Sequence, residues 1–217
     1  MGSLFSLDTP IWNFMSKVAD LIILNLLAFI CSIPIFTIGA SWTALYFVAI
    51  RMVRKEEGYI IKDFFRSFRE NFKQATRIWL MILLVFGILV GDFLICRMMP
   101  EQIPQFIKVV ICAVGYLVIG TVIYIFPLLA RYDNSIKNTL KNAFILSVVK
   151  FPYTLISIIL IVLPIITAAF VMEIIPIVIV IGISLPAYLI SMMLVRIFRI
   201  FEPEEAVLEN EEETEEG

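Results

Sequence analysis

Long apolar runs constrain this chain more than any other feature of its sequence. Five of them are long enough to cross a bilayer: Leu21–Ile50, Ile78–Cys96, Val109–Ala130, Phe151–Met172 and Ile174–Val195. A helix of about 20 apolar residues spans the hydrocarbon core and satisfies its own backbone groups where water is absent. Hydrophobic residues make up 61% of the chain, against roughly 45–50% in soluble domains. The sequence therefore predicts an all-α, polytopic transmembrane helical bundle with five long spans, forming one membrane domain over residues 1–201.

The first run is too long for one upright helix and is interrupted near its middle. Its 30 residues would extend about 45 Å as a helix, whereas the hydrocarbon core is about 30 Å thick. The stretch "SIPIFTIGAS" (residues 32–41) places Pro34 and Gly39 there, and these residues break helices and permit unusual backbone angles. We favour a hairpin with legs at Pro10–Ile33 and Ala40–Arg54, which would give six spans and a cytoplasmic N-terminus. The alternative is a single tilted crossing.

Four residues of this break are candidates for a structural or functional role: Ser32, Pro34, Thr37 and Gly39. Non-helical backbone at membrane depth persists only where protein or water satisfies it. The hydroxyl groups of Ser32, Thr37, Ser41 and Thr43 could bond the freed carbonyls. We favour a kink packed by its neighbours. The alternative is a cavity or gate, because broken helices form substrate sites in transporters.

The basic residues predict how the chain is oriented. Lys and Arg accumulate on cytoplasmic loops. Residues 51–77 carry eight bases, residues 131–150 carry four and residues 196–199 carry two, which together are 14 of the 17. This alternation predicts a multi-pass protein of the cytoplasmic membrane with its C-terminus in the cytoplasm. Residues 202–217 hold nine acids and no base, a composition that predicts an acidic, disordered cytoplasmic tail.

In residues 60–77, phenylalanines and basic residues recur with the period of an α-helix and fall on opposite faces. Ile61, Phe64, Phe65, Phe68 and Phe72 share one face of a helix, and basic residues take the other. Such a pattern is typical of an amphipathic helix that lies in the membrane interface. We therefore expect the phenylalanines at the acyl boundary and the bases facing the cytoplasm.

A similar segment recurs 68 residues later. "SFRENFKQA" (residues 67–75) aligns without a gap on "SIKNTLKNA" (residues 135–143), and each precedes a pair of spans. The similarity predicts a second cytoplasmic amphipathic helix and a parallel repeat with copies beginning near residues 60 and 131. Chance similarity between two short amphipathic helices is the alternative. The candidate cytoplasmic docking residues on the two segments are Arg66, Arg69, Lys73, Lys137 and Lys141.

Two polar side chains fall inside the apolar runs, where they are costly. For Asn25 we favour a hydrogen bond across helices over a ligand role. Asp92 lies five residues before Arg97, so we favour pairing or snorkelling over a function. Gly87–Gly91 forms a GxxxG pattern, for which we favour packing within the chain over dimerisation.

The sequence offers little for catalysis. It has no histidine, and its three cysteines are scattered through the apolar runs. It contains no P-loop, no zinc-protease motif, no nucleophile elbow and no dinucleotide fingerprint. We therefore expect no enzyme activity, no cofactor or metal and no nucleic-acid partner. The lipid bilayer is the one partner that composition implies, and the oligomeric state stays open.

Three stretches carry a resemblance to a family. "NLLAFICSIPIFTIGASWTALYFV" (Asn25–Val48), "DFFRSFRENFKQAT" (Asp63–Thr76) and "FPLLARYDNSIKNTLKNAF" (Phe126–Phe144) resemble the YesL-like family of bacterial integral membrane proteins. The resemblance spans residues 4 to about 200 and implies no catalytic residues, because the family has no agreed activity. It implies a setting near carbohydrate uptake genes, including sugar ABC transporters.

Two functions follow as expectations. The first is a non-enzymatic accessory or regulatory component linked to carbohydrate uptake, with an ABC transporter or another membrane protein as partner. The alternative is a small sugar transporter in its own right, which the broken first run and the predicted repeat would suit. A solute pathway should line the spans with polar groups, and these are sparse in the sequence.

Overall fold

The computed structural model describes residues 10–56, 58–98 and 103–201, and all regular structure in these ranges is helical. The helices are α1 Pro10–Cys31, α2 Ile38–Arg54, α3 Ile60–Met98, α4 Gln105–Arg131, α5 Ile136–Val149, α6 Phe151–Phe170, α7 Ile175–Ile181 and α8 Ser184–Phe201, with short 3₁₀ turns at Ile35–Thr37 and Met172–Ile174. Four helical segments of the described residues are long and apolar enough to cross a membrane, and the count is five if the bent pair of α7 and α8 is one span. The predicted all-α polytopic bundle is therefore confirmed, with four to five candidate spans.

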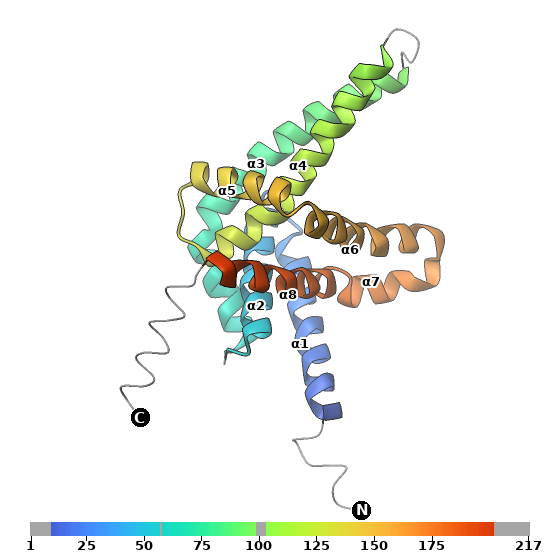
Figure 1. Cartoon of the computed structure of the whole chain (residues 1–217). Helices are drawn as coiled ribbons and strands as arrows, with labels where there is room; N and C mark the ends of the chain where they lie inside the picture. Colours follow the sequence, from blue (N-terminus) through green and yellow to red (C-terminus); the bar gives the residue numbers. More distant parts are fainter. Residues whose placement is uncertain (1–9, 57, 99–102, 202–217) are drawn as a thin grey trace, which may run out of the picture.

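The first apolar run is broken and folds back on itself. Helices α1 and α2 lie side by side and antiparallel, with the short turn at Ile35–Thr37 between them (Figure 1). The Ser41 hydroxyl on α2 donates a 2.9 Å hydrogen bond to the Ala28 carbonyl on α1. The hairpin interpretation is thus confirmed for the path of the chain, and a continuous tilted helix through residues 21–50 is wrong.

The first amphipathic segment is not a separate surface helix. It forms the first half of α3, a single helix of 39 residues that extends roughly 58 Å at 1.5 Å per residue. Phe64 is fully buried against the protein core, whereas Phe65 is exposed. The prediction of a phenylalanine face buried in the acyl boundary is therefore wrong for Phe64, because α2 covers that face.

The second amphipathic segment does form its own helix, α5. Ser135 caps its first turn by accepting a 3.4 Å hydrogen bond from the Asn138 N–H. Helix α5 ends at Val149, and Lys150 alone separates it from α6.

A glycine of the preceding helix lies close to the helix that each similar segment begins. A Cβ atom at Gly39 on α2 would lie 2.7 Å from the Trp79 Cβ, and one at Gly120 on α4 would lie 3.3 Å from the Ser147 Cβ. Trp79 and Ser147 are 68 positions apart, the step that relates the two segments, but the two glycines are 81 positions apart, so the two contacts do not follow one repeat. The parallel repeat stays a prediction.

The last apolar run is bent, which the sequence analysis missed. Helices α7 and α8 meet at an angle of 49° around Gly182 and Ile183. The predicted single span Ile174–Val195 is therefore two helices, of which α7 has no buried residue and α8 packs against α2.

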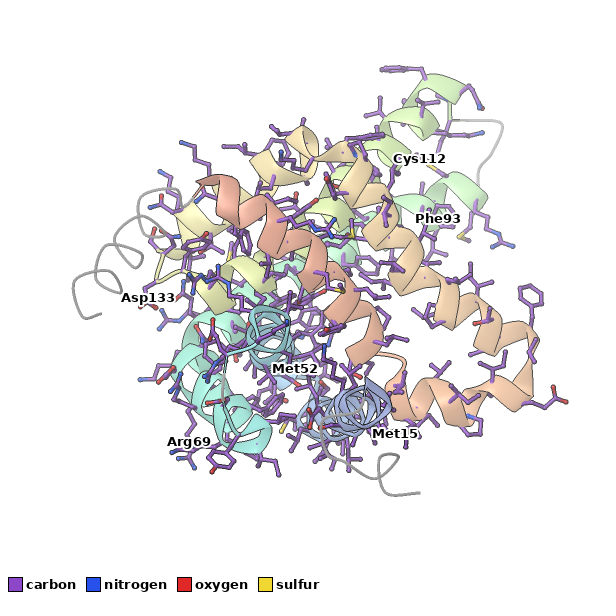
Figure 2. All side chains as sticks on the ribbon, turned by 60° about the horizontal axis from the view of Figure 1, so that its bottom comes forward. Met15, Met52, Arg69, Phe93, Cys112 and Asp133 are labelled. Carbon is purple, nitrogen blue, oxygen red and sulfur yellow. The ribbon has the colours of Figure 1, made fainter. Side chains whose placement is uncertain are left out.

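The core lies around α2, and two arms leave it. Helix α2 contacts α3, α4 and α8. The distal halves of α3 and α4 form one arm and α6 with α7 forms the other, and the two arms diverge from the core (Figures 1 and 2, in which Phe93 and Cys112 mark the first arm). Leu84, Phe106 and Phe170 on these arms are 70%, 73% and 85% exposed. The arms therefore present apolar surface that the described part of this chain does not cover.

The hairpin leads to a test of orientation. The beginning of α1 and the end of α2 lie at the same end of the hairpin, far from the tip of the α3–α4 arm (Figure 1). In a variant whose native cysteines are serine, Lys17→Cys and Lys137→Cys should both resist a membrane-impermeant thiol reagent in intact cells. Lys108→Cys should react, because the predicted topology places it on the opposite side of the bilayer. Labelling of Lys17→Cys in intact cells would contradict the hairpin topology.

Candidate functional site

The end of α1 at the first break is fully hydrogen-bonded. The last four carbonyls of a helix have no partner within it. Here the Phe29 and Ile30 carbonyls accept bonds of 3.1 and 3.2 Å from the next backbone N–H groups. The Ala28 carbonyl accepts from Ser41, and the Cys31 carbonyl accepts a 2.6 Å bond from the Thr37 hydroxyl. The chain can therefore interrupt this helix at membrane depth without water or a ligand.

The Thr37 and Trp79 side chains donate hydrogen bonds to backbone carbonyls of the turn. The Thr37 hydroxyl also lies 2.7 Å from the Pro34 carbonyl, and the Trp79 indole N–H on α3 donates a 2.7 Å bond to the Ile35 carbonyl. The Ser32 hydroxyl is buried and has no hydrogen-bond partner among the described residues. Pro34 occupies an extended conformation before the turn. Of the hydroxyls expected to bond the freed carbonyls, Thr37 and Ser41 do so across the break and Ser32 does not.

Gly39 holds α2 against α3. A Cβ atom at this position would lie 2.7 Å from both the Ala75 carbonyl oxygen and the Trp79 Cβ. Real Cβ atoms do not approach other atoms this closely, and one of the two neighbours is backbone that cannot rotate away. The glycine therefore sets how closely the two helices pack, which places Trp79 beside the break.

Asn25 on α1 binds the second break rather than the first. Its side-chain amide donates a 2.7 Å bond to the Ile179 carbonyl on α7. Its side-chain oxygen accepts 2.9 Å bonds from the Ile183 and Ser184 N–H groups, where α8 begins. The residue is 1% exposed. Asn25 thus caps the end of one helix and the beginning of the next, and all three bonds are made within the chain.

The arms enclose an apolar cavity at the point where they diverge. It has a volume of about 450 Å³ and is lined by aromatic and aliphatic side chains of α2, α3, α4 and α6. Trp42, Tyr46, Trp79 and Phe126 are among its lining residues, and the Trp42 and Trp79 rings lie 5.8 and 6.3 Å from the Phe126 ring. The cavity presents almost no polar surface, so it suits a hydrocarbon chain or an apolar side chain far better than a polyol.

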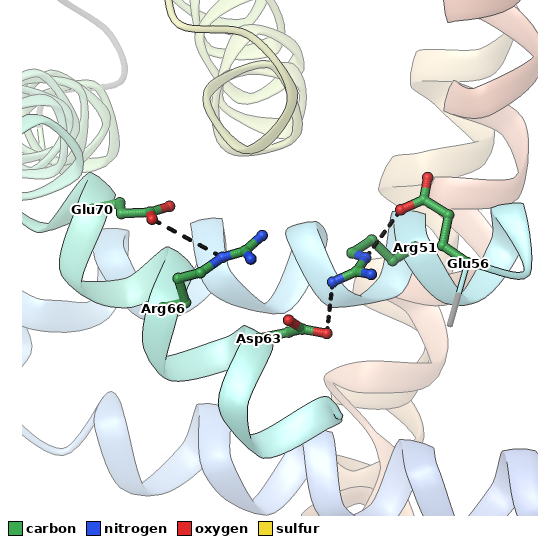
Figure 3. Close-up of polar contacts among 5 residues, drawn as sticks. All are labelled: Arg51, Glu56, Asp63, Arg66 and Glu70. Carbon is green, nitrogen blue, oxygen red and sulfur yellow. Dashed lines mark hydrogen bonds and ion pairs between the residues drawn. The ribbon is translucent and has the colours of Figure 1, made fainter. Parts of the chain in front are cut away.

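A cluster of charged side chains lies at the basic ends of α2 and α3 (Figure 3). The Arg51 guanidinium is 2.7 Å from the Asp63 carboxylate and 3.0 Å from that of Glu56. Arg66 is 4.0 Å from Glu70. The Arg51 and Arg66 guanidinium groups lie 5.9 and 5.5 Å from the centre of the same ring, Phe47. The cluster fixes the loop between α2 and α3 to the core.

The remaining predicted residues are not brought together into a site. Asp92 is half-buried on the first arm, and within the described ranges it has no ion pair with Arg97 or any other residue. Of the two expectations for Asp92, pairing with Arg97 is therefore wrong, and snorkelling stays a prediction. The other predicted docking residues are all exposed at the basic ends of α3 and α5: Arg69, Lys73, Lys137 and Lys141.

Sequence reasoning missed Trp79 and the pair of Arg51 with Asp63. A tryptophan N–H needs a partner when it leaves water, so Trp79 inside an apolar run was a signal. Asp63 is an acid directly before the buried Phe64. A buried acid requires a base or hydrogen-bond donors nearby, so the position of Asp63 was a signal for a partner such as Arg51. The charge pattern alone indicates only that Arg51 helps to set the orientation of the chain.

These features define a polytopic helical membrane protein with two interrupted helices. In the comparisons, a family model described as "Protein of unknown function, DUF624" matches residues 21–93, which are 73 of the 217 residues. The matched range includes Asn25, the first break and most of α3. The searches of curated proteins and of solved structures returned no match. The YesL-like resemblance stays a prediction beside this match to an uncharacterised family.

Proposed function

We propose that this chain is a non-enzymatic accessory component of a bacterial membrane assembly, and that its first arm binds a transmembrane helix of a partner protein. The observation that carries the proposal is an exposed face along α3. Leu84 and Ile88 are 70% and 59% exposed, and a Cβ atom at Gly87 or Gly91 would meet nothing within 4 Å. The expected packing of this GxxxG pattern within the chain is therefore wrong.

The two glycines favour a protein partner over lipid on this face. Glycine costs a helix about 1 kcal/mol relative to alanine, and contact with lipid alone returns none of this cost. Glycines four residues apart let a second helix approach closely, which gains dispersion contacts and weak hydrogen bonds. The face is on a span, so the partner is an integral membrane protein. We propose further that the protein lies in the bacterial cytoplasmic membrane with its C-terminus in the cytoplasm. The proposed partner belongs to a carbohydrate uptake system, such as a sugar ABC transporter, and this last part rests on the family resemblance.

Site-specific photo-crosslinking tests this proposal. A photoreactive residue at Ile88 should give a discrete adduct with another membrane protein in native membranes. The matched control is Leu26 on α1, which is 58% exposed and should give none. Gly87→Ile with Gly91→Ile should reduce the Ile88 adduct at least tenfold while the variant keeps its expression, because the added side chains meet nothing inside the chain. An adduct of two copies, or with lipid alone, would contradict the proposal.

The apolar cavity between the arms does not favour the alternative function, a sugar transporter. A sugar hydroxyl buried without a hydrogen bond costs several kcal/mol, on the order of 2–7, and the apolar cavity between the arms has almost no polar surface to offer. We expect vesicles containing the purified chain to show no sugar uptake above empty vesicles. Saturable uptake of any sugar would favour the alternative.

A further inference from the structure

The cluster at the basic ends of the helices borders a pocket that neither the comparisons nor the proposed function explains. The pocket has a volume of about 280 Å³ and lies between the ends of α2 and α4 and the first half of α3. It is lined by Phe47, Ile50, Arg51, Glu56, Arg66, Ala130 and Arg131. Three arginines from three different helices thus line one hollow, with Glu56 as the single acidic residue among the lining residues.

The Arg51 and Arg66 side chains are held in place by residues of the protein core. Asp63, which is 9% exposed, holds Arg51 from the protein side at 2.7 Å. The guanidinium groups of Arg51 and Arg66 are both within 6 Å of the Phe47 ring. Holding two like charges near one ring is unfavourable unless negative charge lies close to both. Asp63 and Glu56 supply that charge to Arg51, and Glu70 lies 4.0 Å from Arg66. The Glu56 side chain is on the loop after α2 and is 41% exposed.

From this arrangement we infer that the pocket binds a phosphate-bearing anion, which takes the place of Glu56 beside Arg51. Guanidinium groups present N–H donors in a planar fork that matches phosphate oxygens. Three of them suit a dianionic phosphate better than a single carboxylate. The volume is just below the roughly 300–1,000 Å³ typical of sites for drug-sized ligands, so the pocket suits a phosphate with a small substituent.

Two sources of this anion share the same chemistry. The pocket lies at the end of the molecule where the basic residues gather, and basic pockets between spans at the cytoplasmic surface bind lipid head groups. The head group of an anionic phospholipid could therefore enter from the membrane, and a small phosphorylated solute could enter from the cytoplasm. The inference does not depend on the proposed partner protein.

Binding of inorganic phosphate to the purified full chain, in a detergent free of anionic lipid, tests the solute source. Phosphate should raise the unfolding temperature of the wild type saturably. Arg66→Ala and Arg131→Ala should each weaken the apparent affinity at least tenfold. Arg69→Ala is the matched control, because it removes an exposed arginine one turn along α3 that does not line the pocket. Glu56→Gln should strengthen binding, since it removes the competing carboxylate and keeps the shape.

Native mass spectrometry tests the lipid source. The wild type from mixed micelles should retain phosphatidylglycerol over phosphatidylcholine, and Arg66→Ala should lose this preference while Arg69→Ala keeps it. Either a phosphate response or a lipid preference with this pattern of variants supports the inference and identifies the source. Absence of both in the wild type would overturn it. Equal losses in Arg66→Ala and Arg69→Ala would also overturn it, because they would indicate general surface charge.

Discussion

Replacing Asn25 with leucine should lower the unfolding temperature of the purified protein by about 4–20 °C. The change leaves the Ile179 carbonyl and the Ile183 and Ser184 N–H groups without the partner that they have now. Hydrogen bonds between membrane helices contribute about 0.6–1.7 kcal/mol each, so three of them amount to about 2–5 kcal/mol. For a chain of this length each kcal/mol shifts the midpoint by roughly 2–4 °C.

The neighbouring exposed residue provides the control for Asn25. Leu26→Ala changes the next position of α1, where the side chain is 58% exposed, and should shift the midpoint by no more than about 2 °C, as surface substitutions do. Thermal unfolding of both variants in the same detergent gives the comparison. If Asn25→Leu unfolds at the wild-type temperature, then the amide does not hold α7 and α8 in their bent arrangement.

Adding one methyl group at Gly39 and at Gly87 should have effects of opposite sign. At Gly39 the new Cβ would lie 2.7 Å from the Ala75 carbonyl oxygen, so α2 and α3 must separate, at a cost of about 1–3 kcal/mol. At Gly87 nothing lies within 4 Å, and alanine gains up to about 1 kcal/mol in helix propensity. Both changes are made in helices that span the membrane.

The two alanine variants are compared by their resistance to unfolding in one detergent. Gly39→Ala should unfold several degrees below the wild type, and Gly87→Ala should unfold at the wild-type temperature or slightly above. Gly39→Val should be worse than Gly39→Ala, because the larger side chain meets the same backbone. A Gly39→Ala protein that is as stable as Gly87→Ala would show that α2 and α3 do not pack as closely as described.

The long spans and the first break could be predicted because they depend on local sequence. Apolar length identifies a membrane helix, and Pro34 disrupts a helix wherever it occurs. The bend between α7 and α8 could not be predicted in this way. It contains Gly182 but no proline at the break itself, and the residue that bonds it, Asn25, belongs to another helix. The apolar run Ile174–Val195 therefore predicts one continuous span.

The continuity of α3 was misjudged for a different reason. The pattern changes from amphipathic to uniformly apolar near residue 78, and this change predicts a helix boundary that the structure does not have. No proline or glycine occurs between Gly58 and Gly87, so the backbone had no local reason to stop there. For the candidate site, the sequence supplied Arg66 but not its neighbours in the pocket, because Arg51 and Arg131 join it only through the packing of three helices.

The contacts of Asn25 also bear on how the protein is made. Its hydrogen-bond partners lie 154 to 159 residues later in the chain. At about 5–20 residues per second, a ribosome needs roughly 8–30 s to produce them after Asn25. Throughout that interval α1 is already available for insertion, but the hydrogen-bond partners of the Asn25 amide have not yet been synthesised. The first helix therefore reaches its final environment only when α7 and the start of α8 are synthesised, and a nascent chain arrested before Ile179 would expose this amide to lipid or to the insertion machinery.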